Sequence, residues 1–82
     1  MVHVKYAGQS HDIEFDHLFP EHRWEAIGIR DGQTPTPQNV TQDQVRTALA
    51  DHFDVARDEF GDHFIEINPN GNITVRPEAT YG

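Results

Sequence analysis

The chain opens with a regular alternation of apolar and polar positions. Apolar side chains occupy every second position at Val2, Val4 and Tyr6. This period of two is typical of a strand with one buried face. A turn containing glycine follows at residues 7–9, and a second alternating run begins after it. Two such runs joined by a short turn predict a β-hairpin.

The polar positions of the second run are acidic. Asp12, Glu14 and Asp16 alternate with Ile13 and Phe15, so we expect them to form the solvated face of the second strand. They lack the glycine and the distant bidentate glutamate of a calcium-binding loop. The expected role of this set is an exposed acidic surface, available to a basic protein partner.

The clearest helical signal begins at Thr41. Thr41 and Gln44 have the spacing of a capping box, in which each side chain satisfies a free backbone amide at the helix start. Residues at three- and four-residue intervals then predict one face packed on the sheet, formed by Val45, Ala48, Leu49, His52 and Phe53. The segment after the helix is expected to be a loop or short turn, anchored by Val55 and Phe60.

A second hairpin is predicted at the end of the chain. The apolar run at residues 64–67 leads into Asn70-Gly71, a pair that tolerates the positive φ of tight turns, and residues 73–75 lead out. Arg76 and Pro77 close this strand. A short, flexible polar tail is expected over residues 78–82.

The middle segment, residues 17–40, has two interpretations. Pro20 fits the first turn of a short helix that reaches Trp24 or Ile27, whereas residues 25–30 also fit a strand. The prolines of residues 34–37 predict an extended loop. Trp24 is expected to fill the core beneath this loop, with an exposed anchor for a partner as the alternative.

Length and charge narrow the classes of function. The chain of 82 residues fits one domain, and its formal net charge is −8. This charge argues against binding to nucleic acid or to an anionic membrane, and it permits a basic protein partner. With neither a signal-peptide pattern at the start nor an apolar run of the ~20 residues that a membrane span needs, we expect a cytoplasmic protein.

The sequence offers few candidates for catalytic or metal-binding residues. The chain has no cysteine, which excludes thiolate metal sites and cysteine nucleophiles. Its 6 histidines match no metal-binding pattern, although His3 and His11 are expected to approach each other across the first hairpin, beside an acid. The clustered Asp58, Glu59 and Asp62 lie in a polar segment with nothing to desolvate them, as acid–base catalysis by paired carboxylates would need. We therefore expect neither a metal nor a cofactor, and no enzymatic activity.

The predicted order of elements resembles that of the β-grasp fold, as in ubiquitin-like proteins and the small sulfur carriers of molybdopterin and thiamin synthesis. The similar parts are Val2–Tyr6 with its hairpin partner, the helix capped by Thr41, and Ile73–Arg76 followed by a tail that finishes at Gly82. The resemblance implies a single α+β domain over residues 1–82. It would be built as hairpin, variable segment, helix and hairpin, with one main helix packed on a mixed sheet.

The resemblance also implies a function. In these families a partner enzyme adenylates the carboxylate of the last glycine, which is then passed on as a thioester, thiocarboxylate or conjugate. This chain would act in the same way through Gly82, although Tyr81 replaces the first glycine of the usual pair. The body would bind the activating enzyme through an exposed sheet face.

The alternative is an acidic protein-binding module, such as an adaptor, an immunity protein or an inhibitor of a basic partner. The residues expected to contact a protein partner are Asp12, Glu14, Asp16, Trp24 and Arg76. Both functions need a protein partner, and the sequence leaves the oligomeric state open.

Overall fold

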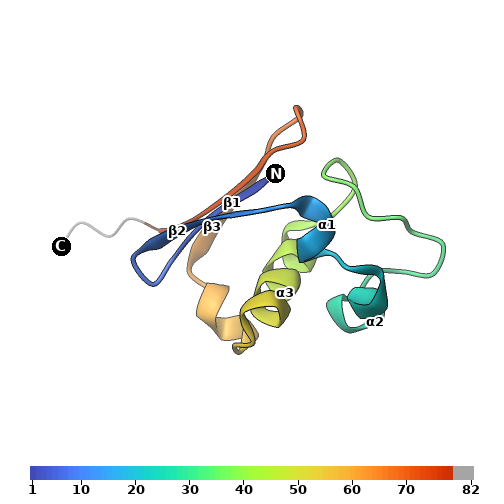
Figure 1. Ribbon diagram of the computed structural model, residues 1–82, viewed down its shortest axis with the longest axis horizontal. Coiled ribbons are helices and arrows are strands. Elements are labelled where there is room, and N and C mark those ends of the chain that lie inside the picture. Colours follow the sequence, from blue (N-terminus) through green and yellow to red (C-terminus); the bar gives the residue numbers. More distant parts are fainter. Residues whose placement is uncertain (79–82) are drawn as a thin grey trace.

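The computed structural model describes residues 1–78 (Figure 1). Four strands form one mixed sheet in the spatial order β2-β1-β4-β3. Their bounds are Val2–Tyr6 for β1, Gln9–Ile13 for β2, His63–Ile67 for β3 and Ile73–Pro77 for β4. β1 pairs antiparallel with β2 and parallel with β4, and β3 pairs antiparallel with β4. Both predicted hairpins and the α+β class are confirmed.

The main helix, α3, spans Gln42–Phe53 and lies along one side of the sheet (Figure 1). Its predicted capping box is present. The Gln44 N–H donates to the Thr41 hydroxyl at 3.1 Å, and the Thr41 N–H donates to the Gln44 side-chain oxygen at 3.0 Å. These two bonds satisfy backbone donors that have no partner within the helix, so they fix where α3 begins.

The hydrophobic core lies between α3 and the sheet. Val45, Ala48 and Leu49 are fully buried against the inner residues of the strands, as predicted. The prediction for His52 is wrong, because its side chain is exposed while Ala50 is buried. α3 contacts α1 (Phe15–Leu18), α2 (Trp24–Ile27) and the short 3₁₀ helix η2 (Arg57–Phe60) as well as β3. Its buried surface is therefore set by several neighbours and is not a single stripe facing the sheet.

The first part of the middle segment is helical. α1 (Phe15–Leu18) runs into it, η1 (Glu21–Arg23) and α2 (Trp24–Ile27) follow, and residues 28–40 form turns and loops. The backbone carbonyl of Trp24 accepts hydrogen bonds from the N–H groups of Gly28 and Ile29, at 3.1 and 2.9 Å. Because these groups bond within a turn and not to a neighbouring strand, the helical alternative is confirmed and the strand alternative is wrong.

The predicted acidic face of the second strand is also wrong. β2 ends at Ile13, Glu14 precedes the first turn of α1, and Asp16 lies within α1. The chain leaves the sheet here because Phe15 turns toward the core and stacks on Phe19, with ring centroids 4.7 Å apart. All three acidic residues are exposed, but Asp12 belongs to β2 and Asp16 to α1, with Glu14 between the two elements.

An ion pair fastens the middle segment to α3. The Arg23 guanidinium binds Asp51 through two hydrogen bonds, one of which joins Nε to Oδ2 at 3.1 Å. These hydrogen bonds hold the pKa of Asp51 below its ordinary value.

We expect the Asp51→Asn variant to be less stable than the native protein at pH 7. A lowered carboxyl pKa stabilises the fold above the unfolded pKa of about 3.9, and this stabilisation is lost as the pH falls through the lower folded pKa. The difference in Tm between the two proteins should therefore close below about pH 4. Thermal melts from pH 7 to pH 3 measure it, with Asp31→Asn as the exposed control. A pH-independent difference would contradict the assignment.

The turn between β1 and β2 is strained at one residue. Ala7 and Gly8 both have positive φ, at +53° and +76°, and connect the paired residues Tyr6 and Gln9. Glycine takes this conformation freely, whereas an alanine pays about 1–2 kcal/mol for it.

We expect Ala7→Asn to stabilise the protein by about 0.5–1 kcal/mol, since Asn-Gly is the preferred pair in such turns. Urea denaturation measures the change. Ala7→Val should have the opposite effect, because a β-branched residue fits positive φ poorly. Equal stabilities for the two variants would contradict the turn geometry.

The last hairpin turns as expected, with Gly71 at a φ of +95°. Phe60, in the turn η2 (Arg57–Phe60), is the predicted anchor and is completely buried. The N–H of Glu78 still donates to the carbonyl of Asp62 at 3.0 Å. The rest of the predicted tail, including Tyr81 and Gly82, lies outside the described residues.

Candidate functional site

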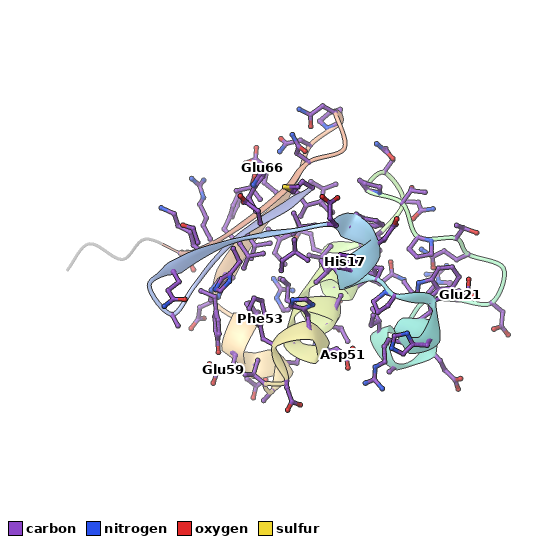
Figure 2. The ribbon with its side chains drawn as sticks, in the orientation of Figure 1. His17, Glu21, Asp51, Phe53, Glu59 and Glu66 are labelled. Atoms are coloured by element: carbon purple, nitrogen blue, oxygen red, sulfur yellow. The ribbon has the colours of Figure 1, made fainter. Side chains whose placement is uncertain are left out.

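α3 covers one face of the sheet and leaves the other face open. Figure 2 shows residues on both sides of the sheet: Glu66 projects away from α3, whereas Phe53 lies on the side that α3 covers. Residues alternate along each strand, so those next to the buried positions point to the open face. We call this surface the open face; it consists of His3, Lys5, Ser10, Asp12, Phe64, Glu66, Thr74 and Arg76.

Strand register arranges these side chains in two rows across the sheet. In the first row, His3 pairs with both Asp12 and Thr74, and Thr74 pairs with Glu66. In the second row, Lys5 pairs with Ser10, and Arg76 pairs with Phe64. Lys5 and Arg76 each follow the paired residues Val4 and Val75, so they lie side by side.

In the first row, His3 and Asp12 form a hydrogen bond with each other. The His3 Nδ1 atom lies 2.7 Å from the Asp12 carboxylate. Both side chains are on the surface, so this contact contributes at most about 1 kcal/mol. The contact engages one carboxylate oxygen of Asp12, whereas Glu66, in the same row, forms no ion pair within residues 1–78.

The second row combines cations with an exposed aromatic ring. Phe64 is 52% exposed, and apart from Met1 it is the only large hydrophobic residue so exposed within residues 1–78. The guanidinium carbon of Arg76 lies 5.3 Å from the centre of the Phe64 ring. This is a cation–π contact, and it leaves the N–H edges of the guanidinium free to bind another group.

A shallow depression of about 410 Å³ crosses the open face over β2, β1 and β4. Its polar lining consists of His3, Lys5, Ser10, His11, Asp12, Thr74 and Arg76. Asp12, in contact with His3, belongs to the first row, whereas Lys5, Arg76 and the hydroxyl-bearing Ser10 belong to the second. The second row suits binding of an anionic group.

Of the residues predicted to bind a partner, only Asp12 and Arg76 lie on the open face, in different rows and on strands separated by β1. Glu14 and Asp16 lie where the chain has left the sheet. Trp24 is half-buried against the core, and its indole N–H donates to the carbonyl of Phe19 at 2.7 Å. Both features fit the core interpretation of Trp24.

Phe64 and Lys5 were not predicted to belong to this surface. The apolar run at residues 64–67 contained a usable signal, because neighbouring strand residues face opposite sides. Ile65 and Ile67 share one face, so Phe64 must point to the other. The juxtaposition of Lys5 with Arg76 had no local signal, since it depends on pairing between β1 and β4.

His3 and His11 do not approach each other across the first hairpin. His11 pairs with Val4 and so lies on the covered face, where its ring meets the edge of Phe53 with centroids 5.1 Å apart. His3 lies on the opposite face, which makes the predicted approach of these two histidines wrong. In the part of the chain that the structure describes, no group of three or more histidine or acidic residues could hold a metal ion.

A separate aromatic cluster, which includes Tyr6, Phe60 and His63, packs at the end of the sheet next to η2. The Tyr6 hydroxyl donates to Glu59 at 3.3 Å. Burial of Tyr6, with the charge and hydrogen bond of Glu59, raises the pKa of the phenol above its ordinary value. Tyr6 therefore stays neutral and serves as a packing residue.

These features define a small α+β domain with one covered and one open sheet face. No family model, curated protein or solved structure matches the chain. Within residues 1–78, no helix has the length and apolar character needed to cross a membrane.

Proposed function

We propose that the protein is a non-enzymatic, ubiquitin-like modifier or carrier with a β-grasp arrangement. The observation that supports this most is the strand order β2-β1-β4-β3, with β1 and β4 parallel at the centre and α3 along one face. In a β-grasp domain, an N-terminal and a C-terminal hairpin share one sheet in this way. A crossover that contains the helix joins them.

The chemistry of such a carrier resides in the end of its chain. A Gly82 carboxylate oxygen would attack the α-phosphorus of ATP in a partner enzyme, and pyrophosphate would leave. A thiol or other nucleophile would then displace AMP. Glycine lacks a Cβ atom, so its carboxylate can enter a narrow active site. The body then needs no catalytic side chains of its own.

Altering Gly82 tests this proposal. Deleting Gly82, or adding one residue after it, should abolish ATP-dependent formation of a covalent adduct in a lysate of the source cells, as measured by intact-protein mass spectrometry. Adding the same residue before Met1 is the matched control and should leave the adduct intact. Adduct formation that survives loss of Gly82 would sink the proposal.

The acidic protein-binding module is the second candidate. It is favoured by the net charge of −8 and by the exposure of Asp12, Glu14 and Asp16. It predicts association with a basic partner that is weakened when these three residues become lysine and is indifferent to loss of Tyr81 and Gly82. Pull-downs with both variants separate the two functions.

A further inference from the structure

Two cations on the open face lack a charged partner among residues 1–78. Lys5 and Arg76 lie side by side, and neither forms an ion pair within residues 1–78. Like charges at adjacent positions of neighbouring strands repel each other. In a chain with a net charge of −8, placing two of the 6 lysines and arginines together creates a local positive site.

The neighbours of this pair indicate what it would bind. On one side, Phe64 offers an exposed ring that the Arg76 guanidinium already covers in part. On the other side lies Ser10, whose hydroxyl lines the same depression as Lys5. Across the row, therefore, polar, cationic, cationic and aromatic groups follow one another. A complementary ligand carries negative charge beside an apolar group.

We propose that the open face is a docking surface for an acidic peptide segment of a partner protein. Carboxylates of the segment bind Lys5 and Arg76, and an adjacent apolar side chain covers Phe64. Arginine pairs well with a carboxylate because its planar N–H edge binds both oxygens. Covering Phe64 removes apolar surface from water and excludes solvent from the neighbouring charges.

A peptide fits the site better than a nucleic acid. Binding to a phosphate backbone needs many cations in a row, and the open face has two, bordered by Asp12 and Glu66. Those carboxylates would repel a continuous run of phosphates. A segment with a few carboxylates fits between them.

The overall negative charge of the protein does not prevent this docking. At physiological ionic strength, charges beyond about 8 Å are largely screened. Lys5 and Arg76 touch such a ligand directly, whereas acidic residues farther away than this act on it weakly. The contact charges decide the binding.

Titration with a synthetic peptide tests the proposal. The probe is a short fluorescent peptide with aspartates and glutamates around one leucine and one phenylalanine. The matched peptide has asparagine and glutamine at the acidic positions. We expect the acidic peptide alone to bind the full chain, and to shift NMR amide signals of β1 and β4 more than those of α3.

Variants separate specific docking from general charge attraction. Lys5→Glu and Arg76→Glu should each weaken binding about tenfold or more, which corresponds to about 1.4 kcal/mol. Arg30→Glu is the matched control, because Arg30 is exposed, lies off the open face and forms no ion pair within residues 1–78. It should bind like the native protein. Lys5→Gln keeps the test usable if either glutamate variant fails to fold.

Several results would overturn the proposal. They are equal binding of the two peptides, equal weakening by Arg30→Glu, and signal changes centred on α3. Binding that occurs only after deletion of residues 79–82 would also overturn it, since the chain's own end would then be the occupant. Deleting Gly82 alone should leave docking unchanged, so this test is independent of the carrier function.

Discussion

Replacing Phe60 with alanine is expected to lower the free energy of unfolding by about 3–5 kcal/mol. Phe60 is completely buried, and its ring centroid lies 4.9 Å from those of both Tyr6 and His63. It joins η2 to the end of the sheet, and the smaller side chain would leave a cavity between the aromatic rings. Because small domains have a total stability of about 5–15 kcal/mol, this loss is a large fraction of it.

Urea denaturation followed by circular dichroism measures this loss. Phe64→Ala is the matched control: it makes the same chemical change on the open face, where the ring is 52% exposed. We expect this variant to cost about 1 kcal/mol or less, from lost contact with Arg76 and a lower strand propensity. Comparable costs for the two variants would contradict the division of the sheet into covered and open faces.

The second large effect is expected at Val4, in the centre of the sheet. Val4 is 1% exposed and faces α3, whereas Lys5, the next residue, is exposed on the open face. Val4→Asn loses the burial of an apolar side chain, about 1.5–3 kcal/mol. It also places an amide where nothing compensates its lost hydration, for about 1–3 kcal/mol more. We expect a total of about 3–5 kcal/mol.

Lys5→Asn is the neighbouring control. The side chain stays in water, so its effect should be within about 0.5–1 kcal/mol, from strand propensity alone. Thermal and urea melts of both variants give the comparison. If Lys5→Asn were as destabilising as Val4→Asn, the open face would be covered by another part of the chain, and docking there would be excluded.

Local patterns predicted the elements whose cause is local. The alternation at Val2, Val4 and Tyr6 needs only the geometry of a strand with one buried face. The capping box of Thr41 and Gln44 lies within one helical turn, and the turn at Gly71 depends on the φ of a single residue. These predictions were confirmed because the residues that form each pattern are the same residues whose interactions produce the element.

Predictions failed where the outcome depends on distant contacts. Phe15 continues the alternation of β2, yet it stacks on Phe19 and takes the chain out of the sheet. His52 has the helical spacing of a core residue, but the neighbours of α3 leave it in solvent and bury Ala50 instead. Packing in three dimensions outweighed the local period in both places.

The candidate site was predictable only in part. The sequence identified Asp12 and Arg76 as residues for a partner, and strand parity alone would have placed Phe64 opposite to Ile65. It could not place Arg76 beside Lys5. These residues are far apart in the chain, and they meet because β1 and β4 pair in parallel.

The two hairpins, the start of the main helix and the acidic character of the protein could all be predicted, because each depends on neighbouring residues or on composition. The parallel pairing of β1 with β4 and the open face of the sheet could not be predicted from local patterns. Strand order depends on which surfaces pack together across the whole chain. The pairing of Lys5, Arg76 and Phe64 on one surface follows from that order.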